Sequence, residues 1–239
     1  MWITLAAVLL AVSDVSQSQT RVVSLPPEKA LSIEVTIGTV RIVGSDRKDV
    51  EIVVDRRGPA ADDLKKLPVV VDDSAERVQV KAVQLNGGTD PLLRADVTVR
   101  VPRSAVIDSV RVLEGRIVVE QFSGTLTADV RRGPIEGKEL AGTLRLETGI
   151  GDVVLANARL SPTGLLRLRT FNGDVRLVLA ARPDHARIMA LALNGEVASD
   201  IPLTHRNTWG PRWAEATIGR GEPVISIDVV TGKVEIKSP

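Results

Sequence analysis

The chain of 239 residues contains no cysteine, no tyrosine, only two histidines and few aromatic residues of any kind. Without cysteine it can form no disulfide, zinc–thiolate site or iron–sulfur cluster, and it has no thiol nucleophile. The two histidines, His185 and His205, cannot build a histidine cage around a metal. Aromatic residues make up 2% of the chain, so the stacking platforms on which proteins hold bases or sugars have almost no material.

An excess of charge of one sign is also lacking, because 31 basic and 30 acidic residues leave a net charge of +1. Nucleic-acid-binding domains normally carry a basic excess, and we therefore expect no nucleic-acid partner. Valine, in contrast, is abundant, with 35 residues. Branched side chains are stiff at χ1 and pack well on a pleated, half-buried surface. The composition thus predicts β-structure.

An apolar run near the N-terminus, Ile3–Val12, is too short for a transmembrane helix, which needs about 20 residues. It matches the apolar core of a secretory signal peptide, although no lysine or arginine precedes it. A buried strand or a short uncleaved anchor is the alternative. Small residues suit cleavage in two places: Ala11 with Ser13, and Ser16 with Ser18. We predict a signal peptide over residues 1–19, export to the periplasm, cell surface or medium, and no integral membrane segment.

Two segments repeat one another without a gap, LRLETGIGDVVL (144–155) and LRLRTFNGDVRL (166–177). In each, apolar and polar residues alternate on both sides of a glycine, Gly151 or Gly173. Such alternation predicts strands with one buried and one exposed face, and glycine permits a positive φ between them. The repeat therefore predicts a strand–corner–strand unit. The same frame fits five further glycines: Gly38, Gly115, Gly133, Gly195 and Gly232.

Two arrangements of these units fit the pattern. In one, each glycine closes a tight hairpin, and the chain forms an antiparallel sandwich or barrel. In the other, each glycine marks a corner, and successive units stack as the parallel ladders of a β-solenoid, or β-helix. A hairpin would oppose Arg169 to Arg176, and like charges weaken a strand pair. Stacking would bring Glu147 beside Arg169, although it would also place Arg145 beside Arg167.

We therefore predict an all-β fold with parallel β-solenoid repeats over residues 106–239. Residues 20–105 are less regular, and we expect them to form an antiparallel cap that joins the repeats in one continuous domain, 20–239. Two helical turns are expected at 60–67. Strands are expected at 31–36, 39–44, 50–54, 68–72, 77–83 and 95–101.

The sequence resembles the bacterial putative adhesin family over residues 25–239. The family is exported and largely of unknown function, so the resemblance implies export and a β-solenoid-like fold and assigns no catalytic residues. The motifs that carry it are VTVRVPRSA (97–105), EGRIVVEQFSGTLTADV (114–130), the TGIGDVVL and TFNGDVRL units, and the C-terminal VTGKVEIKS.

Three acidic residues, Asp152, Asp174 and Glu196, each follow one of the repeat glycines. In a solenoid they would stack along one edge on neighbouring units, and hard oxygen ligands of this kind could hold Ca²⁺. The alternative is that they are solvated turn residues, which is ordinary chemistry for Asp after Gly. Since Ca²⁺ takes six or more oxygens, we expect no cofactor and keep calcium as a hypothesis to be tested.

The stretch 199–222 is the longest interruption between repeat glycines, and it holds Trp209, Arg212 and Trp213. Tryptophan and arginine are enriched at binding hot spots, so these three residues are a candidate binding site. The alternative is a cap whose indole rings plug the open end of the core, because the ends of a solenoid need covering.

The sequence as a whole predicts a non-enzymatic, monomeric binding or scaffold module of a bacterial envelope, similar in role to an adhesin. Its partner would be an envelope protein or a surface polysaccharide, held by several weak contacts along the strands. A carbohydrate-active enzyme built on a β-helix is one alternative, which would require paired carboxylates in a groove. An accessory protein of envelope stress that binds a membrane partner is another.

Overall fold

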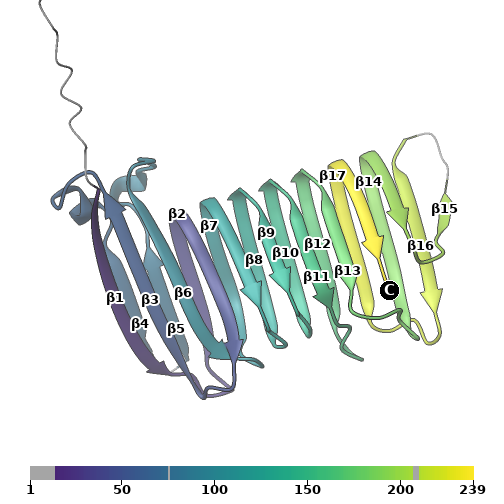
Figure 1. The fold of residues 1–239 in the computed structure, drawn as a ribbon, viewed down its shortest axis with the longest axis horizontal. Coiled ribbons are helices and arrows are strands. Elements are labelled where there is room, and N and C mark those ends of the chain that lie inside the picture. Colours follow the sequence, from purple (N-terminus) through teal and green to yellow (C-terminus); the bar gives the residue numbers. More distant parts are fainter. Residues whose placement is uncertain (1–13, 75, 207–209) are drawn as a thin grey trace, which may run out of the picture.

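The computed structural model describes residues 14–74, 76–206 and 210–239, which form an all-β protein, as predicted (Figure 1). Two short 3₁₀ helices, η1 (Asp63–Lys66) and η2 (Leu85–Gly87), interrupt the strands, and η1 replaces the helix expected at 60–67. The strands are β1 (Val15–Ser24), β2 (Ala30–Ser45), β3 (Asp49–Gly58), β4 (Val69–Asp73), β5 (Arg77–Ala82), β6 (Arg94–Pro102), β7 (Val106–Glu120), β8 (Thr125–Arg132), β9 (Ile135–Lys138), β10 (Thr143–Ile150), β11 (Val153–Ala158), β12 (Leu165–Asn172), β13 (Val175–Leu179), β14 (Ala186–Ser199), β15 (Thr204–Arg206), β16 (Arg212–Ile218) and β17 (Val224–Lys237).

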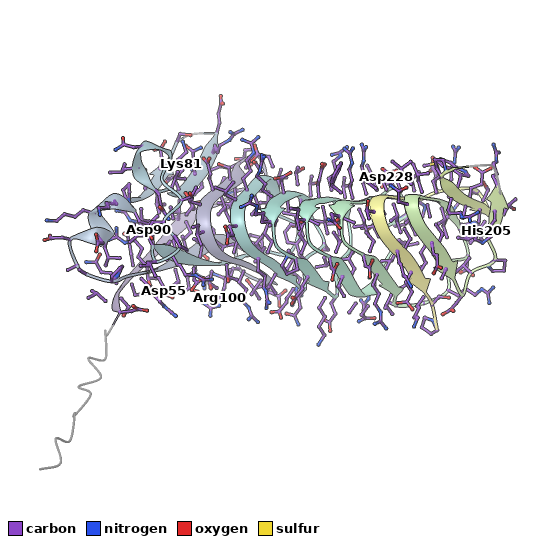
Figure 2. The ribbon with its side chains drawn as sticks, turned by 90° about the horizontal axis from the view of Figure 1, so that it is seen from above. Asp55, Lys81, Asp90, Arg100, His205 and Asp228 are labelled. Carbon is purple, nitrogen blue, oxygen red and sulfur yellow. The ribbon has the colours of Figure 1, made fainter. Side chains whose placement is uncertain are left out.

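The strands form two layers that enclose the core. One layer contains the strand segments that precede the repeat glycines, and we call it the first ladder. Its strand order is β4-β5-β2-β7-β8-β10-β12-β17-β14-β16-β15. The second ladder, formed by the segments after the glycines, has the order β1-β3-β6-β2-β7-β9-β11-β13-β17-β14. In Figure 2, Lys81 and Asp228 project from the first ladder, and Asp55 and Arg100 from the second.

Parallel pairing runs through the middle of both ladders, in the register that the repeat predicts. Leu144 of β10 pairs with Leu166 of β12, and Val153 of β11 pairs with Val175 of β13. The strands on either side of a repeat glycine pair with the next unit and not with each other, so the antiparallel sandwich or barrel is wrong for the repeats. Antiparallel pairs occur at the two ends: β1 with β3, β3 with β6, β4 with β5, β14 with β16, and β15 with β16.

Two features differ from the predicted organisation. The N-terminal portion is not purely antiparallel, because β2 pairs parallel with β5, β6 and β7. At the other end, β17 lies between β13 and β14, and separates two units that are consecutive in the sequence (Figure 1). The chain therefore runs out to β15 and β16 before its last strand returns into the stack.

Seven glycines form one column where the chain passes from the first ladder to the second. At Gly151, φ is +148°, and a Cβ would lie 2.2 Å from the carbonyl oxygen of Gly133. At Gly133 the corresponding distance to the carbonyl oxygen of Gly115 is 1.6 Å. A side chain cannot fit at these distances, so backbone contact sets the corner. In stacking order the column is Gly38, Gly115, Gly133, Gly151, Gly173, Gly232 and Gly195.

The core between the ladders is almost entirely aliphatic, with Phe122 as a fully buried aromatic residue. Two buried polar side chains occur beside the glycine column. The hydroxyl of Thr148 donates to the carbonyl oxygen of Gly133 at 2.8 Å, and the hydroxyl of Thr170 donates to that of Gly151 at 2.9 Å. Buried polar groups need such partners, and these two link one unit to the preceding one.

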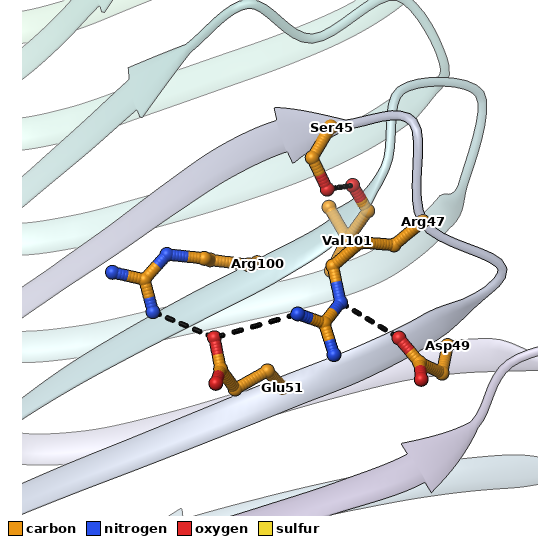
Figure 3. Close-up of polar contacts among 6 residues, drawn as sticks. All are labelled: Ser45, Arg47, Asp49, Glu51, Arg100 and Val101. Carbon is orange, nitrogen blue, oxygen red and sulfur yellow. Dashed lines mark hydrogen bonds and ion pairs between the residues drawn. The ribbon is translucent and has the colours of Figure 1, made fainter.

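Near the β2–β3 turn, charged side chains of the second ladder form a surface network (Figure 3). Arg47 donates to Asp49 at 2.7 Å, and Arg100 donates to Glu51 at 2.6 Å. Arg47 Nη1 also lies 3.7 Å from Glu51 Oε2. Because exposed ion pairs contribute about 0–1 kcal/mol each, this network orders the turn more than it stabilises the fold.

We expect Gly151→Ala to lower the free energy of unfolding by about 3 kcal/mol or more, since overpacking costs about 1–3 kcal/mol and left-handed backbone about 1–2 kcal/mol. The matched control is Gly87→Ala, where φ is +67° but a Cβ would meet no atom within 4 Å. Urea denaturation measures both variants. If Gly151→Ala and Gly87→Ala lost the same free energy of unfolding, backbone contact at the glycine column would not be the cause of the loss.

Candidate functional site

A groove of about 680 Å³ runs along the outer side of the first ladder beside the glycine column. Strands β7, β10 and β12 supply apolar side chains to it, namely Leu113, Ile150 and Phe171. Phe171 is 64% exposed although it is one of only two phenylalanines in the chain. Exposed apolar groups that line a groove are typical of binding sites.

Sequence reasoning missed these apolar residues as members of a site. Ile150 directly precedes the corner glycine Gly151. Phe171 directly follows Thr170, the last buried residue of β12, and Asn172 separates it from the corner. For Leu113 and Phe171 the available signal was an apolar residue at a position where the alternation requires an exposed one. No such signal marks Ile150, because the alternation predicts that position to be buried.

A smaller hollow of about 250 Å³ adjoins the groove, and the two share Asp129 and Glu147. We call the combined surface the arginine face, because arginines outnumber carboxylates on it by six to three. The arginines are Arg111, Arg131, Arg132, Arg145, Arg167 and Arg169, and the carboxylates are those of Glu34, Asp129 and Glu147.

Most charges on the arginine face have no ion-pair partner within the described part of the chain. Of its six arginines only Arg169 forms an ion pair, with its Nη1 3.6 Å from Glu147 Oε1. Arg145 and Arg167 lie in register on β10 and β12, where like charges repel. Their guanidinium groups remain available for carboxylate, sulfate or phosphate, which arginine binds in a planar, bidentate manner.

The second ladder is different, because its outward charges pair with one another. Arg116 pairs with Glu136, Arg41 with Glu120, and Lys233 with Glu196. The pKa of Glu235 lies below its usual value, mainly because Lys237 donates a hydrogen bond to it at 2.8 Å and further because the charges of Lys237 and Arg176 are close. The charges of this ladder are thus largely satisfied internally, and the first ladder is the better candidate for binding a charged partner.

The structure brings together two of the three acidic residues proposed for calcium. Asp152 and Asp174 lie on neighbouring units, and Asp152 Oδ1 accepts the backbone N–H of Asp174 at 2.8 Å. Asp174 Oδ1 accepts the backbone N–H of Lys233, also at 2.8 Å. The expectation that Glu196 continues this stack directly is wrong, because β17 inserts Lys233 between them.

These carboxylates therefore act as hydrogen-bond acceptors that join one unit to the next. An equivalent hydrogen bond occurs near the N-terminal end of the stack, where Asp96 Oδ1 accepts the backbone N–H of Thr39 at 2.9 Å. Across residues 14–74, 76–206 and 210–239, no cluster of three or more His, Asp or Glu side chains could hold a metal ion.

The stretch 199–222, which holds Trp213, contains strands β15 and β16, and these two strands form the end of the stack beyond β14. Trp213 pairs in register with Leu191, next to the buried pair Ala214 and Ala190. Since neighbouring residues of a strand face opposite sides, Trp213 lies on the outer side of the first ladder, and the expectation that its ring plugs the core is wrong. Arg212 is exposed at the start of β16, and Trp209 lies outside the described residues.

No family model and no curated protein sequence matches the chain. Solved structures that the chain matches include a putative cell adhesion protein from Clostridium sporogenes, with 13% identity, 94% of this chain and 100% of that chain covered, and a TM-score of 0.49. A putative adhesin from Bacteroides fragilis has 14% identity, coverages of 92% and 97%, and a TM-score of 0.47. A putative lipid binding protein from Parabacteroides distasonis has 11% identity, coverages of 92% and 96%, and a TM-score of 0.35.

Proteins called putative adhesins are therefore among the structures that the chain resembles, as the sequence resemblance implied. Identities of this size are too low to transfer a function. The described residues contain no helix long and apolar enough to cross a membrane.

We expect Asp174→Ala to lower the free energy of unfolding by about 1.5 kcal/mol, because it removes an exposed hydrogen bond to a charged acceptor. Asp174→Asn, which keeps an acceptor oxygen, should retain most of that stability. Urea denaturation with and without Ca²⁺ measures both effects. A rise in the free energy of unfolding with Ca²⁺ that is lost in Asp174→Asn would instead support the calcium hypothesis.

Proposed function

We propose that this protein is an exported, non-enzymatic β-solenoid module that binds an acidic surface polysaccharide through the arginine face. The observation that carries the proposal is that five of the six arginines on this face lack a carboxylate partner among the described residues, whereas the second ladder pairs most of its charges. An acidic polymer would supply the missing counter-charges.

The parallel stack suits a repeating ligand. Neighbouring strands lie about 4.8 Å apart, so Thr127, Arg145, Arg167 and Ser226 form a row of hydrogen-bond donors across β8, β10, β12 and β17. Each contact to a solvated anion is weak, and several along one polymer sum to useful avidity. Phe171 and Ile150 offer apolar surface farther along the same strands, in the groove that adjoins this row. A repeating polymer fits this row better than an acidic envelope protein does, and a single copy of the chain suffices.

A carbohydrate-active enzyme is the second candidate, and one observation favours it. Asp129 and Glu147 lie in register on neighbouring strands and line both hollows of the arginine face. Paired carboxylates are what glycoside hydrolysis requires. An assay for new reducing ends on each bound polysaccharide tests this candidate. Turnover that Asp129→Asn and Glu147→Gln both abolish would overturn the non-enzymatic proposal.

We expect immobilised polygalacturonate to bind the protein at low salt and to release it as the salt concentration rises, because salt screens exposed charges. The double variant Arg145→Ser/Arg167→Ser should weaken binding at least tenfold, and Phe171→Ala severalfold. Surface plasmon resonance with neutral dextran as the reference surface measures both.

The matched control is Arg41→Ser/Arg176→Ser, which removes the same charge from the second ladder. It should change the affinity less than twofold. If the two double variants lost the same affinity, the binding would be non-specific charge attraction. If the protein bound acidic envelope proteins but no acidic polysaccharide, the proposed ligand would be rejected.

Export by a cleaved signal peptide belongs to the same proposal, and β1 supports one of the two cleavage positions. Val15–Ser18 of β1 pair with Asp55–Gly58 of β3. Cleavage after Ser13 leaves these pairs intact, whereas cleavage after Ser18 removes them.

We therefore expect the mature exported protein to begin at Asp14. Intact mass measurement of protein from a bacterial periplasm or medium tests this directly. A mature chain that begins at Gln19 would show that the first four pairs of β1 are dispensable, and a chain that keeps Met1 would reject the cleaved signal peptide.

A further inference from the structure

A second basin, of about 570 Å³, lies on the edge opposite the glycine column. Three connecting loops build it: 158–163 after β11, 180–185 between β13 and β14, and 220–223 between β16 and β17. None of the residues that line it belongs to the arginine face. Loops held by a rigid scaffold are the usual place for binding residues.

Each of the three loops contributes one arginine to this basin, namely Arg159, Arg182 and Arg220. Two carboxylates, those of Asp184 and Glu222, also line it. Within the described residues, however, none of these five side chains takes part in an ion pair. Three guanidinium groups that line one basin, and that have no ion-pair partner among the described residues, are suited to binding an oxyanion.

His185 adds a further donor, and its orientation is fixed. Its Nδ1 accepts the backbone N–H of Arg220 at 3.1 Å, so the neutral imidazole must carry its proton on Nε2. The contact also leaves no room for a side chain at Gly219, where a Cβ would lie 1.9 Å from Nδ1. The loop 180–185 is thus joined to the loop that carries Arg220, which places the Arg182 and Arg220 loops side by side.

Apart from Thr163, the rest of the basin is apolar. Leu160, Pro162, Pro183 and Pro223 line it together with alanines from β11 and the 180–185 loop. Its volume is within the range of small-molecule sites, about 300–1,000 Å³, which combine apolar walls with a few directed polar groups. A fully hydrated inorganic ion would leave these walls unused, whereas an organic anion would contact both.

We propose that this basin binds a small organic anion, through a phosphate or carboxylate group held by Arg159, Arg182 and Arg220 and the Nε2–H of His185. The same chemistry is offered by a soluble sugar phosphate or sugar acid and by the head group of an anionic lipid. The site is independent of the arginine face, since the two share no residue.

The test is isothermal titration calorimetry on the whole protein with glucose 1-phosphate, glucuronate, inorganic phosphate and neutral glucose, and co-sedimentation with phosphatidylglycerol vesicles against phosphatidylcholine vesicles. We expect the two organic anions to bind more tightly than inorganic phosphate, and glucose not to bind. Binding to phosphatidylglycerol vesicles, and not to the soluble anions, would identify a lipid head group as the source of the anion.

The variant Arg182→Ser/Arg220→Ser should weaken binding at least tenfold, and Arg182→Lys/Arg220→Lys should recover only part of it, because lysine keeps the charge and loses the bidentate geometry. Arg57→Ser/Arg94→Ser, at the other end of the stack, is the matched control and should leave the affinity unchanged. Thermal unfolding of each variant checks that it is folded.

The proposal would be overturned if no organic anion bound to the protein. It would also be overturned if Arg57→Ser/Arg94→Ser weakened anion binding as much as Arg182→Ser/Arg220→Ser does. Binding of inorganic phosphate as tightly as the organic anions would reject the role of the apolar walls. The glucose 1-phosphate affinity of Arg145→Ser/Arg167→Ser separates the two sites, because loss of arginines from the arginine face should leave binding in the basin unchanged.

Discussion

The close approach of backbone to backbone at the glycine column is the constraint on which the rest of the structure depends. A Cβ at Gly133, Gly151 or Gly173 would lie about 2 Å from the carbonyl oxygen of the neighbouring glycine, so the units can stack in one register only. A slip by one residue would turn every aliphatic side chain outward. The hydroxyls of Thr148 and Thr170 and the carboxylates of Asp152 and Asp174 then reinforce that register with bonds from one unit to the next.

Much of this arrangement was predictable, because it depends on local alternation. The inward residues and the glycine positions follow from the repeat. The parallel pairing of 144–155 with 166–177 was favoured over a hairpin by the charges of Glu147, Arg169 and Arg176. The position of β17 did not follow, since Ile225, Ile227 and Val229 fit beside β12 and β14 as well as any other aliphatic row would. When every unit presents similar columns, alternation fixes which side faces the core but not which unit is the neighbour.

The candidate sites were less predictable, for a related reason. Sequence reasoning selected Asp174 because carboxylates recur after glycine, yet its oxygen already accepts a backbone N–H. Trp213 was selected for its residue type, and only the register with Leu191 shows which side of the first ladder it occupies. Arg145 and Arg167 stood out in the sequence as an unfavourable pair. Whether the other charges around them are paired depends on side chains from several units, and that information is absent from any single repeat.

The stack also explains why the two proposed binding surfaces can differ in character. The regular strands of the first ladder can only repeat a column, so the arginine face presents rows of similar donors suited to a polymer. The edge opposite the glycines consists of loops whose length varies between units, and this freedom allows Arg159, Arg182 and Arg220 to converge on one basin. The glycine column fixes the backbone at one edge of the stack, whereas the loops at the opposite edge can vary in length and sequence. We infer that specificity for a small ligand arises in those loops.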